Sequence, residues 1–287
     1  MLILVAGSKS QIGEDLFKYF KKKTDIIGLE RNKITINKLK DKKSKIIRTK
    51  DPFKYLIKKK INFDLYINCI VVHEYSKKKN KKFFFQSNVL ILRKLVKIFN
   101  LQKKNSLFVN FSTRKVSELN FINSKKQSKI INMYAQTKKL GELEAQKCNK
   151  NYVNLRLPGV ITKKINPNRP WFSKIIKSVK SNRVIKIYNY NKNFNNFIDT
   201  YEIFLILLKL KKIKKIKGTF EISSSIPEKL GNIINMIIKH FNSSSKILVK
   251  GNTKTHKIIN NKIFTNKTGI KISKTRTILK RILKNYD

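Results

Sequence analysis

Over the first 160 residues, short runs of hydrophobic, largely β-branched residues alternate with longer segments whose apolar positions recur every three or four residues. This alternation is typical of a parallel sheet whose strands are joined by covering helices. The pattern predicts strands at 2–6, 25–29, 45–48, 65–72, 106–111 and 152–156, and helices at 11–22, 83–100 and 134–148. We therefore expect an α/β fold with a doubly wound parallel sheet.

After Pro158 the strict alternation is lost. Helices are predicted at 171–181, 200–210 and 228–241, and strands at 184–187 and 219–223. The sequence thus predicts a first domain over residues 1–160 and a smaller C-terminal lobe over residues 161–287. Some elements of the lobe have the length and composition to return to the sheet.

The charge of the chain changes this picture little. Among 287 residues, 67 are basic and 16 are acidic, which gives a formal net charge of +51. Such a charge is typical of nucleic-acid binding, but the lysines are spread along the whole length among Ile and Asn. This distribution favours a solvated surface over a specific nucleic-acid site. The positive field should still attract anionic ligands, including pyrophosphates.

Membrane and metal-binding classes find no support in the sequence. The apolar run at residues 1–7 is too short for a signal peptide, and no stretch reaches the roughly 18–20 apolar residues that span a bilayer. Cys69 and Cys148 both lie in segments that read as buried elements, which supports neither a disulfide framework nor a zinc site. We expect a cytoplasmic, metal-free protein without a membrane partner.

The segment Gly7-Ser-Lys-Ser10-Gln-Ile-Gly13 lies between the first strand and its helix, where a dinucleotide fingerprint belongs. The first glycine permits a tight turn, the last permits close packing of helix on strand, and the helix N-terminus then faces a pyrophosphate. The usual middle glycine is Ser10, whose hydroxyl can reach a phosphate. The predicted cofactor contacts are Gly7, Ser10, Gln11, Ile12 and Gly13. The alternative is a plain strand-to-helix turn without a nucleotide.

The second predicted strand leads into Glu30 and Arg31. An acidic residue at this point accepts hydrogen bonds from the adenosine ribose hydroxyls, which favours NAD. Arg31 can instead hold a 2′-phosphate, so NADP stays open. An exposed ion pair without any ligand is the simpler interpretation of these two residues.

Tyr134 and Lys138 are four residues apart on one predicted helix and so share a face. A phenol with a pKa near 10 is a poor base at neutral pH, but a neighbouring ammonium stabilises the phenolate and lowers that pKa. The pair therefore predicts acid/base chemistry. A tyrosine that only packs its ring is the alternative, because a lysine-rich chain produces this spacing by chance.

Together these segments resemble an extended short-chain dehydrogenase/reductase of the NAD-dependent nucleotide-sugar epimerase/dehydratase family. The resemblance covers about residues 2–225 and is clearest in the first 160. It rests on seven landmarks in order: the loop Gly7–Gly13; Gly28-Leu-Glu30-Arg31; Asn88; Phe108-Val-Asn-Phe-Ser112-Thr113; Tyr134-Ala-Gln-Thr-Lys138-Lys-Leu-Gly-Glu142; Leu155-Arg156-Leu-Pro158-Gly-Val; and Asn196-Phe-Ile-Asp199. The fold it implies is Rossmann-like, with a substrate-binding C-terminal lobe.

The resemblance also implies roles for single residues. Tyr134 would be the acid/base on a sugar hydroxyl, Lys138 would bind the nicotinamide ribose and tune Tyr134, and Thr113 would orient the reacting oxygen. Asn88 and Pro158 would contact the cofactor, and the expected substrate contacts are Ser112, Thr113, Arg156 and Asn196. Arg156 is equally well explained as an ion-pair partner within the protein, and Asp199 as the cap of the next helix.

Within this family, the residues after Thr113 bear on the reaction. Dehydratases have a Thr-Asp-Glu run there, whereas this chain has Arg114 and Lys115, and two cations cannot supply that acid/base pair. The sequence also departs from the family pattern at 68–71 and 116–118, which border cofactor and substrate.

We therefore expect a nucleotide-sugar epimerase, or a related oxidoreductase, that acts through a keto intermediate in surface-polysaccharide synthesis. A keto-reductase and a non-catalytic NAD(P)-binding regulator are the alternatives. Family members also pair through two long helices, which predicts a homodimer formed by residues 83–100 and 134–148.

Overall fold

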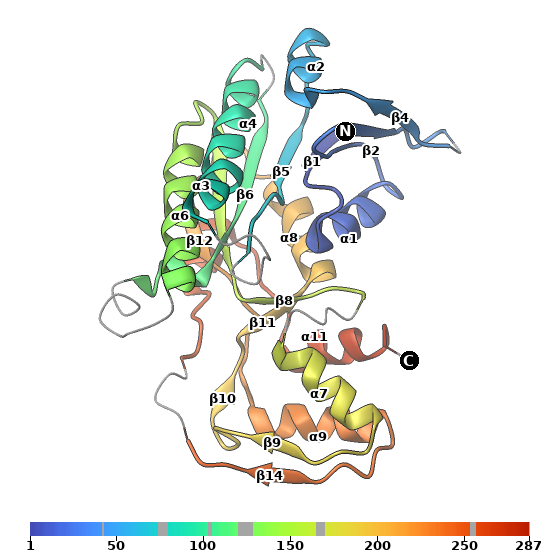
Figure 1. Cartoon of the computed structure of the whole chain (residues 1–287), viewed down its shortest axis with the longest axis vertical. Helices are drawn as coiled ribbons and strands as arrows, with labels where there is room; N and C mark the ends of the chain where they lie inside the picture. Colours follow the sequence, from blue (N-terminus) through green and yellow to red (C-terminus); the bar gives the residue numbers. More distant parts are fainter. Residues whose placement is uncertain are drawn as a thin grey trace. The chain divides into compact units, whose positions relative to one another are not determined.

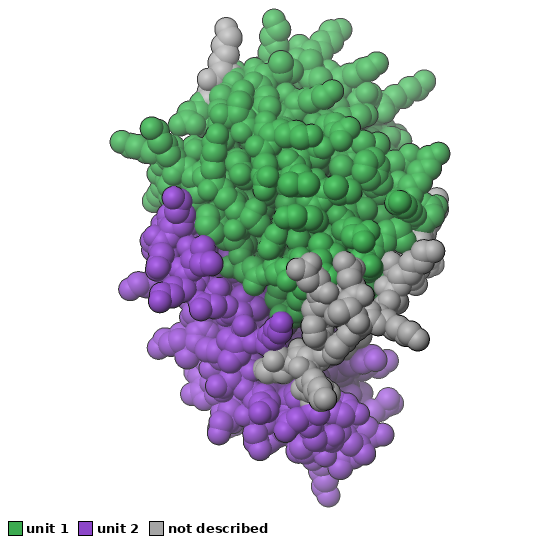
Figure 2. Space-filling model, turned by 90° about the vertical axis from the view of Figure 1, so that its left-hand side faces the viewer, with its two compact units in different colours: residues 1–157, 204–221 green, residues 158–203, 222–287 purple. Residues whose placement is uncertain are grey.

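The computed structural model describes residues 1–41, 43–73, 80–102, 105–119, 129–164, 170–252 and 257–286. The chain forms two compact units, coloured separately in Figure 2. The first unit contains Met1–Leu157 and Phe204–Glu221, and the second contains Pro158–Ile203 and Ile222–Asp287. Residues 204–221 thus belong with the N-terminal part of the chain, although they follow the first segment of the second unit.

The first unit is built on an eight-stranded sheet (Figure 1). Five neighbouring pairs of its strands are parallel, and β1 lies between β2 and β5. The direction of winding therefore reverses at β1, and ligands of such sheets bind where the order reverses, beyond the carboxyl ends of the strands. The order is β12 (Lys217–Glu221), β7 (Asn151–Leu157), β6 (Leu107–Thr113), β5 (Leu65–Asn68), β1 (Leu2–Ala6), β2 (Asp25–Leu29), β3 (Lys33–Asn37) and β4 (Lys45–Arg48). The expected Rossmann-like α/β fold is confirmed.

One edge of this sheet differs from the prediction. The strand at 45–48 was expected in an all-parallel sheet, but it pairs antiparallel with β3, a strand that the pattern analysis did not predict. β3 in turn pairs antiparallel with β2. Only three residues join β2 to β3 and seven join β3 to β4, which is too few for the crossover that parallel pairing needs, so neighbouring strands here pair antiparallel.

Helices cover both faces of the sheet. Alternate residues of β1 face opposite sides, and Leu4 and Ala6 belong to a buried cluster with residues of α2 (Pro52–Lys58), α4 (Ile91–Asn100) and α6 (Lys129–Gln146). On the other side, α1 (Gln11–Phe20) contacts α8 (Thr200–Leu210) through Phe20 and Phe204, whose ring centroids are 4.8 Å apart. Figure 1 shows α4 and α6 side by side, away from α1 and α8.

The long helix predicted at 83–100 is interrupted. It consists of α3 (Lys81–Phe85), a π-helical turn η1 (Gln86–Leu90) and α4. The π turn contains Asn88, whose side chain bonds outside its own helix. Such turns are frequent at functional sites, because they move a side chain out of regular α-helical register.

The close contact between η1 and α6 depends on Gly141. A Cβ atom at Gly141 would lie 2.7 Å from the Asn88 backbone oxygen and 3.3 Å from Leu92 Cδ2. Alanine at a helical glycine gains about 1 kcal/mol from propensity, but overpacking against a backbone oxygen, which cannot move aside, costs the upper part of the usual range, about 2–3 kcal/mol. We expect Gly141→Ala to lower the free energy of unfolding by about 1–2 kcal/mol, measured by urea denaturation. Gln136→Ala, an exposed site on the same helix, should show no loss, and an equally stable Gly141→Ala would contradict this packing.

The second unit contains three small sheets and four further helices among its described residues. β8 (Gly159–Ile161) pairs with β11 (Phe197–Asp199) and β9 (Ile185–Ile187) with β14 (Ile247–Val249), both in parallel, whereas β10 (Asn193–Phe194) and β13 (Glu228–Lys229) are antiparallel. The helices are α7 (Pro170–Lys180), α9 (Leu230–His240), α10 (Lys262–Thr268) and α11 (Thr275–Leu283). In the parts of the chain that the structure describes, no helix has the length and hydropathy of a membrane span.

Candidate active site

The glycine loop after β1 has no room for side chains at its two glycines. Gly7 has a positive φ of 81°, and a Cβ there would lie 3.0 Å from backbone atoms of Cys69 and Ile70. At Gly13 a Cβ would lie 2.1 Å from the Gly7 oxygen. The loop therefore packs tightly against the chain that leaves β5 and against the first turn of α1. Glycines at these positions are typical of loops whose backbone approaches a dinucleotide closely.

Ser10, in place of the middle glycine, serves as the N-cap of α1. Its hydroxyl accepts a hydrogen bond of 3.1 Å from the Gly13 N–H, so its capping bond starts the helix. Gln11 and Ile12 form the first turn, and Glu14 is the only acidic residue there. The tight loop and the α1 N-terminus at the reversal point of the sheet fit a pyrophosphate.

Glu30 and Arg31 lie at the start of the β2–β3 turn, which is closed by a 2.9 Å hydrogen bond from the Glu30 N–H to the Lys33 oxygen. Glu30 is partly exposed and Arg31 is exposed. The Ser8 hydroxyl is 3.5 Å from Glu30 Oε1, and a Cβ at Gly28 would lie 2.6 Å from that hydroxyl. Gly28 therefore makes room for Ser8 beside the carboxylate, a contact that sequence reasoning missed. These residues fit a ribose at the end of β2.

Helix α6 places Tyr134 and Lys138 against β6. Both side chains are buried, and the Lys138 ammonium donates a hydrogen bond to the Phe111 carbonyl, two residues before Thr113. Tyr134 belongs to an apolar cluster with Val72 and Phe84. The predicted pair thus lies on a helix that is fixed to the strand carrying the predicted Thr113.

Burial lowers the pKa of Lys138 from 10.5 to about 8, although Glu142 and Cys69 act in the opposite direction. Between these pH values the unfolded chain binds a proton that the folded protein has released, so stability should rise with pH. The full penalty, on the order of 3 kcal/mol, is present below about pH 8 and disappears above the unfolded pKa.

We therefore expect the free energy of unfolding to increase between pH 8 and 10.5 in wild type by more than in Lys138→Met, as urea denaturation at each pH would measure. The exposed Lys97 provides a control, because Lys97→Met should keep the wild-type dependence. Identical pH profiles for the two variants would contradict the assignment.

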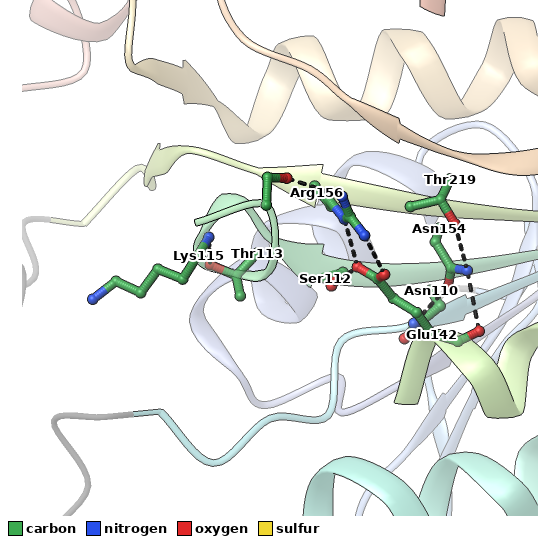
Figure 3. A network of polar contacts seen from close by, with 9 residues as sticks. Asn110, Ser112, Thr113, Lys115, Glu142, Asn154, Arg156 and Thr219 are labelled. Carbon is green, nitrogen blue, oxygen red and sulfur yellow. Dashed lines mark hydrogen bonds and ion pairs between the residues drawn. The ribbon is translucent and has the colours of Figure 1, made fainter. Parts of the chain in front are cut away.

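One turn after Lys138, the buried carboxylate of Glu142 joins α6 to the strand β7 (Figure 3). Glu142 is 1% exposed and forms a bidentate ion pair with Arg156 on β7, with N–O distances of 2.9 and 2.7 Å. It also accepts a 2.5 Å hydrogen bond from Ser112, and Arg156 donates to the Ser117 hydroxyl at 2.9 Å. The structure thus engages Ser112 and Arg156 within the protein, and their predicted contact with substrate stays a prediction.

A row of three asparagine amides and one threonine hydroxyl continues this polar layer across the sheet. Asn68, Asn110, Asn154 and Thr219 occupy matching register positions on β5, β6, β7 and β12. Their side chains are linked by hydrogen bonds of 2.9, 2.8 and 3.1 Å, and Asn154 also donates to the Glu142 backbone oxygen at 3.3 Å. Figure 3 shows the part of the row beneath α6. The row ties the strands in register and joins α6, the helix of Tyr134 and Lys138, to them.

Thr113 ends β6 and caps a short 3₁₀ turn, η2 (Arg114–Val116), by accepting a long hydrogen bond of 3.4 Å from the Lys115 N–H. Arg114 forms an ion pair of 3.1 Å with Glu118. The cations after Thr113 therefore belong to a folded turn at the strand end. Because the turn directly follows Thr113, it would border the oxygen that Thr113 is predicted to orient.

Asn88 ties two segments of the first unit together. Its amide accepts a 2.9 Å hydrogen bond from the Val72 N–H and donates to the Val72 oxygen and the Thr137 hydroxyl at 3.2 and 3.1 Å. The side chain is buried. Asn88 thus joins the segment after β5 to the helix of Tyr134, and its predicted contact with the cofactor stays a prediction.

The remaining predicted site residues lie in the second unit. Pro158 precedes β8, and the Asn196 backbone oxygen accepts a 3.3 Å hydrogen bond from Gly159. Asp199 accepts a 2.9 Å hydrogen bond from the Glu202 N–H and so caps α8, which is the structural role that the sequence analysis gave for this residue. It also forms an ion pair of 2.7 Å with Arg281.

Comparisons with known proteins agree with this geometry. No curated protein matches the sequence. Among solved structures, a dTDP-4-dehydrorhamnose reductase from Bacillus anthracis in complex with NADP is 13% identical, with a TM-score of 0.74 over 98% of this chain and 96% of that one. A UDP-glucuronic acid 4-epimerase from Bacillus cereus, in complex with UDP-glucuronic acid and NAD, is 16% identical, with a TM-score of 0.70 over 100% of both chains.

A UDP-glucose 4-epimerase from Thermotoga maritima with UDP-glucose is 12% identical, with a TM-score of 0.71 over 100% of this chain and 98% of that one. At these identities the structures establish the fold. A family model described as the NAD dependent epimerase/dehydratase family matches residues 3–216. The protein therefore belongs to the NAD-dependent epimerase/dehydratase family and is an enzyme that uses NAD or NADP.

Proposed function

We propose that the enzyme is a nucleotide-sugar epimerase, or a closely related oxidoreductase, that acts at a sugar carbinol through a keto intermediate. The observation that carries the proposal is the placement of Tyr134 and Lys138 on a helix that is bonded to the strand of Thr113. When bound, NAD accepts and returns a hydride. The protein supplies the site and the proton chemistry.

In this proposal Tyr134 removes the proton from the sugar hydroxyl and later returns it. The buried Lys138, whose pKa is lowered to about 8, is poised to change its charge near physiological pH and to stabilise the phenolate when protonated. Thr113 donates a hydrogen bond that orients the reacting oxygen. The hydrogen bond from Lys138 to the Phe111 carbonyl favours the orientation in which the lysine lies on the helix face that it shares with Tyr134.

The residues after Thr113 support exchange of hydride over loss of water. Dehydration needs a carboxylic acid and a carboxylate beside the sugar, whereas Arg114 and Lys115 follow Thr113 and Arg114 is paired with Glu118. A guanidinium cannot give up its proton at neutral pH, so it cannot act as the base. A dehydratase is therefore the weaker candidate.

The test is a turnover assay with the nucleotide sugars for which proteins of similar fold are named or with which they are complexed. UDP-glucose and UDP-glucuronic acid would each be incubated with NAD, and dTDP-4-dehydrorhamnose with NADH and NADPH. An epimerase changes the proton NMR spectrum of the sugar without net change in NADH absorbance, whereas a reductase consumes NADH or NADPH in proportion to product. Mass spectrometry of protein purified without added ligand identifies any retained dinucleotide or nucleotide sugar. Loss of water from a sugar, or no turnover in any mixture, would contradict the proposal.

The proposal includes the cytoplasmic location and the surface-polysaccharide pathway that the sequence resemblance implies. It also includes pairing of two copies through the helical segments 83–100 and 134–148. Leu140 and Leu143, both on α6, are 41% and 42% exposed, which supports an apolar contact there. Sedimentation of wild type and of Leu140→Glu would test the pairing, since a charge in a buried dimer contact favours monomers.

A further inference from the structure

His73 lies against the ring of the proposed acid/base. It belongs to the segment after β5, and its ring centroid is 4.8 Å from that of Tyr134, with 40° between the ring planes. Tyr134 is 4% exposed and also contacts Val72 and Phe84. The phenol ring is therefore surrounded by side chains from outside its own helix.

The position of His73 is fixed through its neighbour. The backbone N–H and oxygen of Val72 both bond to the Asn88 amide, at 2.9 and 3.2 Å. The same amide donates to Thr137, which follows Tyr134 by three residues on α6. Because one side chain holds both the segment of His73 and the helix of Tyr134, the two rings are held in register with each other.

This arrangement has a direct consequence for the phenol hydroxyl. Rotation of the ring about its own axis leaves the hydroxyl where it is, but rotation about the Cα–Cβ bond would carry it away from the substrate. Planar contacts on the ring oppose the second rotation, and tilted aromatic pairs at this distance are favourable. Displacement of a reacting group by about 1 Å can cost about 100-fold in rate.

We propose that His73 is a positioning residue for the reaction, whose imidazole ring holds the phenol of Tyr134 in its reactive orientation. The inference rests on the proposed role of Tyr134 as the acid/base. It predicts that the planar ring matters more than the identity of its atoms. A phenylalanine at this position should therefore replace the histidine, whereas an alanine should not.

The test compares His73→Ala, His73→Phe and His240→Ala with wild type on whichever of UDP-glucose, UDP-glucuronic acid or dTDP-4-dehydrorhamnose the wild type converts. His73→Ala should lower kcat by about 10- to 100-fold with KM within about threefold, and His73→Phe should restore kcat to within about threefold of wild type. His240 packs on Phe241 with centroids 4.9 Å apart, so its removal is a matched loss of a ring pair and should leave kcat unchanged. A wild-type kcat in His73→Ala would overturn the proposal, as would equal losses in the alanine and phenylalanine variants.

A second measurement does not depend on the substrate. In protein with ring-labelled tyrosine, the Tyr134 signal among the 10 tyrosines is assigned by its loss in Tyr134→Phe. His73→Ala should shift and broaden this NMR signal, and His73→Phe should keep it narrow. An unchanged Tyr134 signal in His73→Ala would overturn the positioning role. Absence of turnover in wild type would instead contradict the proposed function, so the two failures are distinguishable.

Discussion

Tyr134→Phe should lower kcat by about 10²- to 10⁴-fold, because the variant keeps the ring but loses the hydroxyl that transfers the proton. The ring packs in a cluster with Val72 and Phe84, and phenylalanine preserves those contacts. The free energy of unfolding should therefore change little, and so should the affinity for NADH measured by fluorescence. The expected signature is loss of turnover in a folded protein that still binds its cofactor.

Tyr55→Phe is the matched control, since it makes the same change at a partly buried tyrosine on α2. It should have wild-type kcat and KM. If Tyr134→Phe also kept the wild-type kcat on the true substrate, Tyr134 would not be the acid/base. If it lost NADH binding, the loss of rate would reflect damage to the site and not removal of the proton donor.

Glu142→Ala should be the most destabilising single substitution in the network beneath α6, by about 3–5 kcal/mol. The carboxylate accepts hydrogen bonds from Ser112 and from two nitrogens of Arg156. Its removal leaves a guanidinium that is only 19% exposed without its ion-pair partner, and only the weaker charge interaction with Glu221 remains. Urea or thermal denaturation would measure the decrease in the free energy of unfolding. A decrease of this size is a large fraction of the total stability of a typical domain, about 5–15 kcal/mol.

The double variant Glu142→Leu with Arg156→Met separates the ion pair from the packing. Replacement of both partners by apolar side chains removes the uncompensated charge, so the double variant should be more stable than Glu142→Ala. Lys18→Ala with Glu14→Ala serves as the control pair, because these side chains are 47% and 36% exposed and exposed pairs contribute about 0–1 kcal/mol. A double variant as unstable as the single one would show that the charge is not the cause.

The sequence predicted the elements that repeat a simple pattern. The bounds of β1, β2, β4 and α8 match the predicted ranges. β3 was missed because the surrounding chain reads as a polar, lysine-rich connection, although Lys33–Asn37 itself alternates polar residues with isoleucines and pairs with β2 and β4. The π turn was hidden for a similar reason, since the apolar positions of 83–100 also fit a continuous helix.

The site was predictable where one residue type is required and hidden where partners come from distant strands. Gly7 and Gly13 could be recognised because no side chain fits there. The contact of His73 with Tyr134 joins residues from separate elements, and no local spacing indicates it. The amide row likewise depends on the relative register of four strands, which is a property of the folded sheet.

The edge strand β12 is synthesised long after the other strands of the sheet, so the sheet of the first unit is completed late. β7 can pair with β6 once residue 157 has emerged, but its other neighbour is at Lys217–Glu221. Until then β7 is an open edge strand, with unpaired backbone groups that can pair with other chains. Most of the intervening chain, Pro158–Ile203, belongs to the second unit, which itself needs residues after 221. Neither unit can therefore be completed before the other has begun, and late folding intermediates should be the species most prone to aggregate.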